Sequence, residues 1–171
     1  MQALKLCLRW IDRLSEISGL AVSVLIPAMM LVITYEVVLR YFFRSPTVWA
    51  FDTAIFMFGY IGLIAGAYAL KHGAHVNVDV FYVRLSPRGQ AVIDSITLPL
   101  VLFFLILVLI QGGEAALDGI ARGIRRPTEW GPPLGHFMLM IPIGAGLLIL
   151  QAAANWIRAL YFATTGRELE L

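Results

Sequence analysis

Four long stretches of this chain carry no charged side chain, and they restrict the fold more than any other feature. They cover residues 17–35, 53–70, 95–113 and 130–157, and each holds at least 18 residues. A helix needs roughly 17–25 apolar residues to cross a bilayer. Backbone groups find no water inside lipid, so a spanning segment must satisfy its own hydrogen bonds as a helix. The chain is therefore predicted to be an all-α integral membrane protein with four transmembrane helices.

Composition agrees with this fold class and excludes several functions. The chain is 60% hydrophobic and 14% charged, whereas a soluble domain is about half apolar and a quarter charged. A net charge of +2 is too small and too spread out to indicate a nucleic-acid partner. The sequence holds no nucleotide-binding glycine loop, metalloprotease motif or serine elbow. We expect neither enzymatic activity nor a cofactor.

The N-terminal segment, residues 1–16, differs from the spans because it is charged on one side. At about 100° per residue its charged side chains share one arc of a helix, and apolar side chains fill the rest; the charged set is Lys5, Arg9, Asp12, Arg13 and Glu16. This pattern predicts an amphipathic helix lying in the membrane surface. An ordinary lead-in to the first span explains the pattern equally well.

The remaining elements follow from the charges and prolines. We expect a single domain over residues 1–171 with spans at about 17–39, 50–70, 94–113 and 134–157, and a polar tail at 164–171. Pro27 predicts a kink in the first span because proline removes a backbone donor. The apolar run after Arg13 is too long for a cleaved signal peptide, so the first span is expected to remain. Prolines and glycines make residues 125–133 a loop.

The distribution of lysine and arginine predicts the orientation. With the N-terminus inside, eight of these residues lie on the cytoplasmic side and five on the other side. Cytoplasmic loops carry the excess of positive charge in membrane proteins. Both termini are therefore expected in the cytoplasm.

Glu36 and Arg40 are the most informative charges because they lie near the outer end of the first span. Four residues apart on a helix, they can form an ion pair. An ionisable group within the membrane is also a candidate for proton or ion transport. We favour an ion pair that anchors the end of the span and keep transport as the alternative.

Asp52 and Trp49 lie at the start of the second span. The positive end of the helix dipole stabilises a carboxylate such as Asp52, and tryptophan is enriched at the membrane interface, as expected for Trp49.

One side of the second span carries three glycines, Gly59, Gly62 and Gly66. Gly62 and Gly66 have the small-xxx-small spacing that lets helices approach closely. The contact could be inside the bundle or with a partner protein.

Three histidines, His72, His75 and His136, raise the question of a haem or metal site. The first two follow the second span, whereas His136 opens the fourth span on the opposite side of the membrane. They are therefore too far apart to share one iron. His75 and Asp79 have helical spacing, but two ligands make a weak metal site. A hydrogen-bonded surface pair is the favoured interpretation, and no metal site is expected.

Several short motifs occur in the order and spacing of a known family. They are Glu36-Val-Val-Leu-Arg40-Tyr41-Phe42-Phe43, then Pro46 and Trp49-Ala-Phe-Asp52, Gly66-Ala67, His75-Val-Asn-Val-Asp79 and Arg84-Leu-Ser-Pro87-Arg88. This pattern resembles the DctQ family, the small membrane subunits of tripartite ATP-independent periplasmic (TRAP) transporters. The resemblance covers nearly the whole chain and is strongest over residues 36–88. Asp52 is a mild departure because the family more often has glutamate there, which preserves the charge.

The resemblance implies a role that composition cannot show. Such subunits lie in the bacterial inner membrane and pair, one to one, with a large permease whose elevator domain carries the substrate and sodium sites. A periplasmic binding protein delivers the substrate, usually a carboxylate or other organic acid. This chain would then be a scaffold held in the lipid bilayer by its spans, without catalytic or substrate-binding residues. Its candidate assembly residues are Glu36, Arg40, Trp49, Asp52, Gly59, Gly62, Gly66, His75 and Asp79.

Two other functions remain as alternatives. The chain could be a self-sufficient small transporter that forms homo-oligomers and uses Glu36 as a proton-coupled site. It could also be the membrane anchor of a redox enzyme, which the placement of the histidines disfavours.

Overall fold

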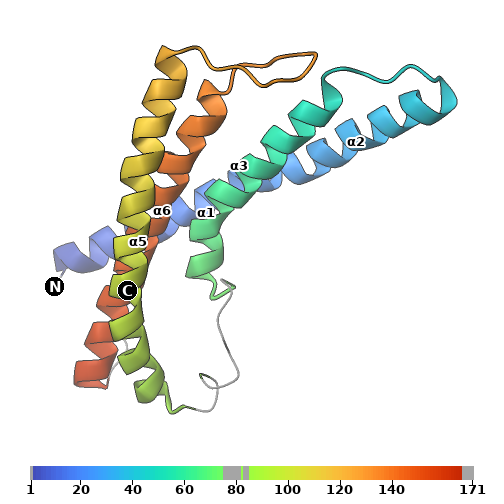
Figure 1. Ribbon diagram of the computed structural model, residues 1–171. Coiled ribbons are helices and arrows are strands. Elements are labelled where there is room, and N and C mark those ends of the chain that lie inside the picture. The colour runs from blue at the N-terminus through green and yellow to red at the C-terminus, as the bar shows by residue number, and fades with distance from the viewer. Residues whose placement is uncertain (1, 75–81, 83–84, 167–171) are drawn as a thin grey trace.

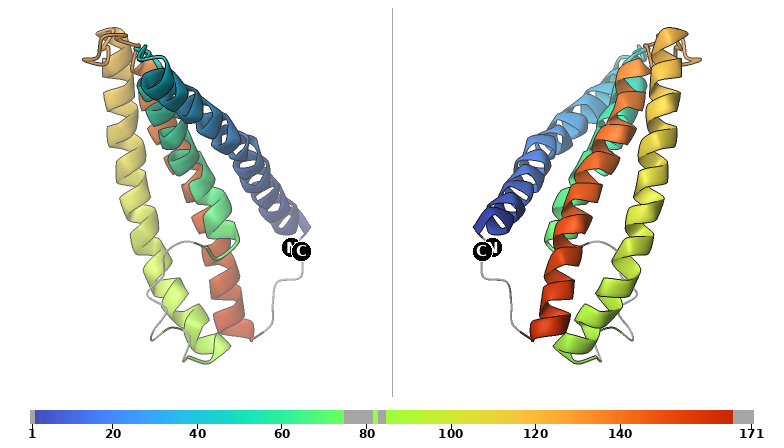
Figure 2. Two further views of the ribbon diagram at one scale, coloured as in Figure 1. Left: turned by 90° about the vertical axis from the view of Figure 1, so that its right-hand side faces the viewer. Right: turned by 90° about the vertical axis from the view of Figure 1, so that its left-hand side faces the viewer.

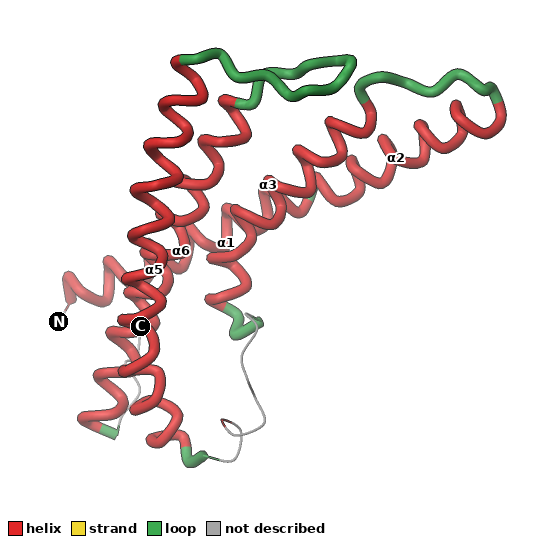
Figure 3. The backbone as a smooth tube through the Cα atoms, in the orientation of Figure 1, coloured by secondary structure: helices red, strands yellow, loops and turns green. Residues whose placement is uncertain are grey.

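Helices account for most of the computed structural model, which describes residues 2–74, 82 and 85–166 (Figure 1). In chain order they are α1 (Gln2–Ser23), α2 (Leu25–Phe42), α3 (Ala50–Lys71), α5 (Pro87–Ala121) and α6 (Gly135–Thr165). Loops join α2 to α3 and α5 to α6, and the described residues hold no strand, only an isolated bridge between Arg125 and Pro133 (Figure 3). The predicted all-α class is confirmed.

Four helical segments are long and apolar enough to cross a membrane. They are Gln2–Phe42, which joins α1 and α2, and the helices Ala50–Lys71, Pro87–Ala121 and Gly135–Thr165. The described residues thus contain the predicted number of spans, and the protein is a multi-pass membrane protein. The last five residues of the predicted polar tail lie outside the described part of the chain.

The N-terminal helical segment is interrupted at Val24, three residues before Pro27. Pro27 has no N–H group to donate to the carbonyl of Ser23, so the helix is broken one turn before the proline. The two helices nevertheless continue in nearly the same direction, so the expected kink is a local break with little bend (Figure 2). α1 passes through residue 16 without interruption, and its depth in the membrane remains a prediction.

The helices pack as two pairs that diverge from each other. α5 lies along α6, α6 packs against α3, and α3 contacts both α1 and α2. The α2–α3 pair leans away from the α5–α6 pair (Figures 1 and 2). Glu36 is the one buried residue of α2. Most of the α2 surface therefore faces outward.

Small residues fill the helix contacts, and large apolar residues face outward. Most of the buried apolar residues are alanines, whereas Leu100 and Phe103 of α5 are more than 60% exposed. A Cβ added to Gly144 would lie 2.4 Å from the backbone oxygen of Leu63, so α6 and α3 approach closely there. Membrane helices associate through such close packing because lipid is as apolar as leucine. The helix contacts therefore depend on these small residues.

Candidate functional site

The first polar cluster lies at the free end of the α2–α3 pair and is centred on Glu36, which is 8% exposed. Its Oε1 accepts hydrogen bonds from Arg40 Nη2 at 2.6 Å and Nε at 3.2 Å. Its Oε2 accepts from the Thr47 backbone N–H at 3.0 Å and the Thr47 hydroxyl at 2.6 Å. The expected Glu36–Arg40 ion pair is present. We call Glu36, Arg40 and Thr47 the tip cluster.

Thr47 extends the tip cluster to the next helix. Its hydroxyl oxygen accepts a hydrogen bond from the backbone N–H of Ala50, the first residue of α3. The Glu36 carboxylate thus fixes the end of α2, the connecting loop and the start of α3 together. Sequence reasoning missed Thr47 because the position of a loop residue depends on how the loop folds back. Nearby, Trp49 stacks on Tyr35 with ring centroids 6.1 Å apart.

A second cluster, the loop cluster, joins α3 to the α5–α6 loop. Asp52 lies in the first turn of α3, where the helix dipole favours a carboxylate. It is 1% exposed, and its Oδ1 lies 2.9 Å from Arg126 Nε as an ion pair. Its Oδ2 accepts a hydrogen bond from the Thr128 hydroxyl. Arg126 and Thr128 were not among the predicted site residues, and they bring the loop across to α3.

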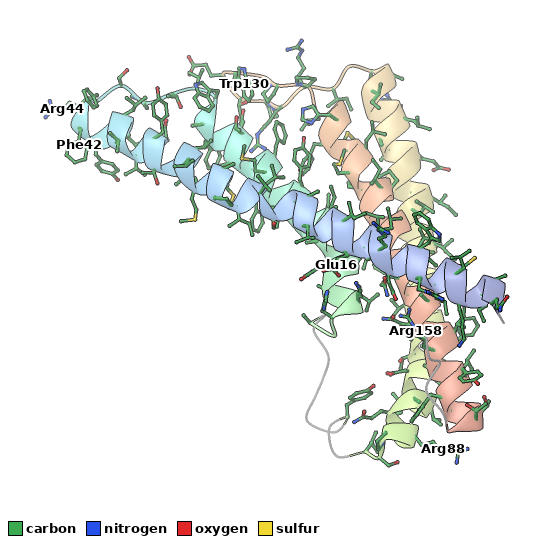
Figure 4. All side chains as sticks on the ribbon, turned by 180° about the vertical axis from the view of Figure 1, so that it is seen from behind. Glu16, Phe42, Arg44, Arg88, Trp130 and Arg158 are labelled. Atoms are coloured by element: carbon green, nitrogen blue, oxygen red, sulfur yellow. The ribbon has the colours of Figure 1, made fainter. Side chains whose placement is uncertain are left out.

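The α5–α6 loop is itself closed by backbone hydrogen bonds. Arg126 N–H donates to the Pro132 carbonyl at 2.9 Å, and Leu134 N–H donates to the Ile124 carbonyl at 2.9 Å. Gly131 has a φ of +58°, a left-handed conformation that glycine adopts without strain. The loop carries the exposed Trp130 at this end of the molecule (Figure 4). The predicted loop is therefore an ordered structure tied to α3.

A third group of polar residues, the α1–α6 network, lies toward the opposite end. Ser15 Oγ donates to Gln151 Oε1 at 2.7 Å, and both side chains are fully buried. Gln151 Nε2 donates to Asp12 Oδ1 at 3.2 Å and to Asn155 Oδ1 at 3.1 Å. Arg158 Nη2 pairs with Asp12 Oδ2 at 2.6 Å. These five residues attach α1 to α6.

Sequence reasoning missed the α1–α6 network because its members lie more than 130 residues apart in the chain. One signal was available: Gln151, Asn155 and Arg158 recur at helical spacing in an otherwise apolar helix. Glu16 on α1 also has partners that are distant in the sequence, because it contacts Lys71 and His72 at the end of α3. Figure 4 shows Glu16 and Arg158 on the side away from the α2 tip.

Tyr82 links the segment before α5 to that helix. Its hydroxyl donates to Asp94 Oδ2 at 2.7 Å. Burial, reinforced by the Asp94 carboxylate, raises the pKa of Tyr82 to about 12. The phenol is protonated at physiological pH, as in an ordinary tyrosine, and serves as the hydrogen-bond donor to Asp94.

The three glycines of α3 do not share one role. A Cβ on Gly59 would lie 2.3 Å from the Phe137 ring, and one on Gly66 would lie 3.2 Å from Leu148. Both glycines therefore face α6. A Cβ on Gly62 would meet nothing within 4 Å. The sequence left open whether the glycines contact another helix of the bundle or a partner protein. In the structure Gly59 and Gly66 contact α6, and Gly62 contacts no other helix that the structure describes.

The described histidines have separate surroundings. His136 Nδ1 is hydrogen-bonded to the Tyr60 hydroxyl, whereas His72 lies against Tyr68 and Glu16. No group of three or more metal-ligating residues occurs among the residues that the structure describes. The candidate residues His75 and Asp79 lie outside those residues. The three clusters join helices and loops to one another.

Comparison with known sequences identifies the family. A family model for the DctQ component of tripartite ATP-independent periplasmic transporters matches residues 29–161. The chain belongs to the DctQ family. The match includes the tip and loop clusters and all of the α6 part of the α1–α6 network, and it confirms the resemblance seen in the sequence motifs. Members of this family are described as the DctQ component of tripartite ATP-independent periplasmic transporters.

Two curated relatives of this DctQ protein come from Vibrio cholerae serotype O1. The C4-dicarboxylate TRAP transporter small permease protein DctQ is 27% identical over 105 residues, which cover 59% of this chain and 45% of the relative. The sialic acid TRAP transporter small permease protein SiaQ is 29% identical over 116 residues, which cover 68% of this chain and 61% of the relative. The matched part thus spans less than two thirds of either relative.

Proposed function

We propose that this TRAP small permease subunit is a static scaffold for a large elevator-type permease, bound one to one. The permease would carry the sodium and substrate sites, and a periplasmic binding protein would deliver the substrate. This chain would hold its helices at fixed positions while the elevator domain moves. It would bind no substrate itself.

The observation that carries this proposal is the complete set of partners around Glu36. Its two oxygens accept four hydrogen bonds from Arg40 and Thr47. A proton-coupling carboxylate must exchange a proton during each cycle, and such sites in secondary transporters lie near the bilayer midplane. Glu36 instead joins the end of α2 to the start of α3. This placement supports an anchoring role over proton transport.

Further support comes from helix surfaces that pack against no other described helix of this chain. α2 packs mainly on α3 and is otherwise exposed, and Gly62 of α3 is open on its outer side. A partner helix can approach a membrane helix closely at a small residue. These surfaces are available to a larger membrane protein without rearrangement of the four-span frame.

The names of two relatives support a class of substrate for the complete transporter. One is named for C4-dicarboxylates and the other for sialic acid, which are both acids. We therefore propose sodium-coupled uptake of a carboxylate or other organic acid by the complete transporter. The residues that distinguish one acid from another would lie on the other subunits.

We further propose that both termini lie in the cytoplasm of a bacterium and that the four spans cross its inner membrane. The excess of lysine and arginine on the N-terminal side supports this orientation. On α1, the exposed apolar side chains Leu6, Trp10 and Leu14 recur every four residues beside Arg9 and Arg13. Such a face suits a helix lying in the membrane surface.

Reporter fusions test the orientation. A reporter active only in the periplasm should be silent after Leu171 and active at Thr128. Activity after Leu171 with silence at Thr128 would reverse the orientation.

Reconstitution tests the scaffold function. Liposomes would contain the large permease and this chain, with binding protein outside and an inward sodium gradient. We expect uptake from the complete set and none from this chain alone. Uptake by this chain alone would contradict the scaffold role, and so would full uptake by the permease and binding protein without it.

A further inference from the structure

A groove runs between α2 and α3 beside the tip cluster, and the known family role does not explain it. The groove has a volume of about 540 Å³ and is open along one side. Pockets for small molecules fall at about 300–1,000 Å³. Ala50 and Ala54 leave space between the helices, and Ile33, Phe51 and Phe58 contribute apolar walls. Its charged lining residues are Glu36 and Arg40, so the groove is charged at one end and mainly apolar along the rest of its length.

The charged end carries more positive than negative charge. Arg40 uses Nε and Nη2 for Glu36, and its side chain is 55% exposed. Arg44, one turn further along, is exposed and forms no ion pair with another described residue. Figure 4 shows Arg44 and Phe42 at the outer end of α2. With Glu36 neutralising one guanidinium, a net positive charge remains at the outer end of α2, where Arg40 lines the groove and Arg44 lies four residues beyond it.

The side chains around this end indicate its depth in the bilayer. Tyr41, Phe42 and Phe43 are 75%, 80% and 68% exposed, and Trp49 stacks on Tyr35 of α2. Tyrosine and tryptophan concentrate at the level of the lipid headgroups. The two arginines thus lie where headgroup phosphates are found, and the apolar part of the groove extends toward the hydrocarbon core.

We propose that this groove binds one phospholipid, with an acyl chain between α2 and α3 and the phosphate held by Arg44 and the outer edge of Arg40. Guanidinium groups bind phosphate oxygens through charge-assisted hydrogen bonds. A partner helix is about 10–12 Å wide and approaches best over small residues. Here Phe51, Phe58 and Tyr41 are large and line the opening, so a flexible chain fits better than a helix.

Photolabelling of the full chain in lipid nanodiscs tests the site. The discs would contain phosphatidylethanolamine and phosphatidylglycerol, with a small fraction of phosphatidylglycerol bearing a diazirine halfway along one acyl chain. We expect labelling to concentrate on the walls of the groove, at Ile33, Phe51 and Phe58, above the level on exposed residues of α5 such as Leu100. Equal labelling of α5 and the groove would show surface lipid only and would overturn the proposal.

Two variants separate the acyl and phosphate contacts. Ala54→Phe fills the groove and should abolish its labelling, whereas Ala115→Phe makes the same change at an exposed position of α5 and should change nothing. Arg44→Gln leaves the groove intact and should weaken lipid retention roughly tenfold in native mass spectrometry, as expected for one charged hydrogen bond. Unchanged retention in Arg44→Gln would contradict the phosphate contact.

The same photolabelling in the presence of the large permease decides whether lipid or protein occupies the groove in the complex. Retained labelling of the groove in the complex is the expected result. If the permease abolishes labelling there and protein cross-links replace it, the groove is a helix-docking surface and the lipid site is refuted. Because the labelling needs no transport, its outcome is independent of the scaffold function.

Discussion

Replacing Asp52 with asparagine should weaken the attachment of the α5–α6 loop to α3. The two side chains have the same shape, but asparagine lacks the charge that pairs with Arg126 at 2.9 Å. Its single carbonyl oxygen can accept from Arg126 while its NH₂ group donates to the Thr128 hydroxyl, which can also act as an acceptor. The loop cluster therefore loses its ion pair, and the Arg126 charge is left without a counter-charge.

The size of the effect follows from burial. The Asp52 side chain is 2% exposed and the Arg126 side chain 23% exposed. Removing one partner of a buried ion pair costs about 3–5 kcal/mol. Because Arg126 retains some access to water, its unpaired charge is partly solvated, and the expected loss is about 2–3 kcal/mol in the free energy of unfolding.

Asp118→Asn is the matched control because it makes the same chemical change in an exposed pair. Asp118 and Arg122 lie four residues apart on α5, and their side chains are 52% and 71% exposed. Such a surface pair contributes about 0–1 kcal/mol. Equilibrium unfolding in mixed micelles, followed by tryptophan fluorescence, compares the two variants. Equal stabilities for Asp52→Asn and Asp118→Asn would refute the reasoning.

A double-mutant cycle with Arg126→Gln adds a sharper test. If Asp52 acts through Arg126, the two substitutions together should cost clearly less than the sum of the single effects. Hydrogen exchange at residues 124–134 should also accelerate in Asp52→Asn. Additive effects, or unchanged exchange in this loop, would show that Asp52 stabilises α3 alone.

Three further predictions concern the other contacts. Glu36→Gln should reduce assembly with the large permease and leave the sodium coupling stoichiometry unchanged; a changed stoichiometry with normal assembly would make Glu36 a transport residue. Gly59→Ala should lower unfolding stability by about 1–3 kcal/mol because its Cβ meets Phe137, whereas Gly62→Ala should be neutral; equal effects would contradict the packing. Arg158→Gln should accelerate hydrogen exchange in α1, which is joined to α6 through Asp12; unchanged exchange would contradict this attachment.

The fold class could be read from the sequence for a physical reason. Water is absent from the bilayer core, so a charge-free stretch of sufficient length has essentially one way to satisfy its backbone. Three features depend only on residues that are close together in the sequence. They are the four spans, the loop at residues 125–133 and the Glu36–Arg40 pair. The family resemblance was likewise carried by local motifs and was confirmed.

Contacts between segments needed the tertiary structure. Asp52 was identified by its place in the first turn of α3, but nothing in its neighbourhood specified Arg126 and Thr128 as partners. In the sequence Gly62 and Gly66 had the small-xxx-small spacing, but in the structure Gly59 and Gly66 face α6, and the position of Phe137 reveals the role of Gly59.

The sequence by itself determined which segments are helices, how many can cross the membrane and which family the chain resembles. Those properties depend on hydrophobicity and hydrogen bonding within each segment. The tertiary structure decided which face of each helix is used: Asp12 and Ser15 on α1 meet Gln151 and Arg158 on α6, and α2 is left outward. Helix pairing in a membrane depends on shape and a few polar contacts, because lipid and protein side chains are equally apolar. Such contacts form between distant parts of the chain, and a local pattern cannot specify them.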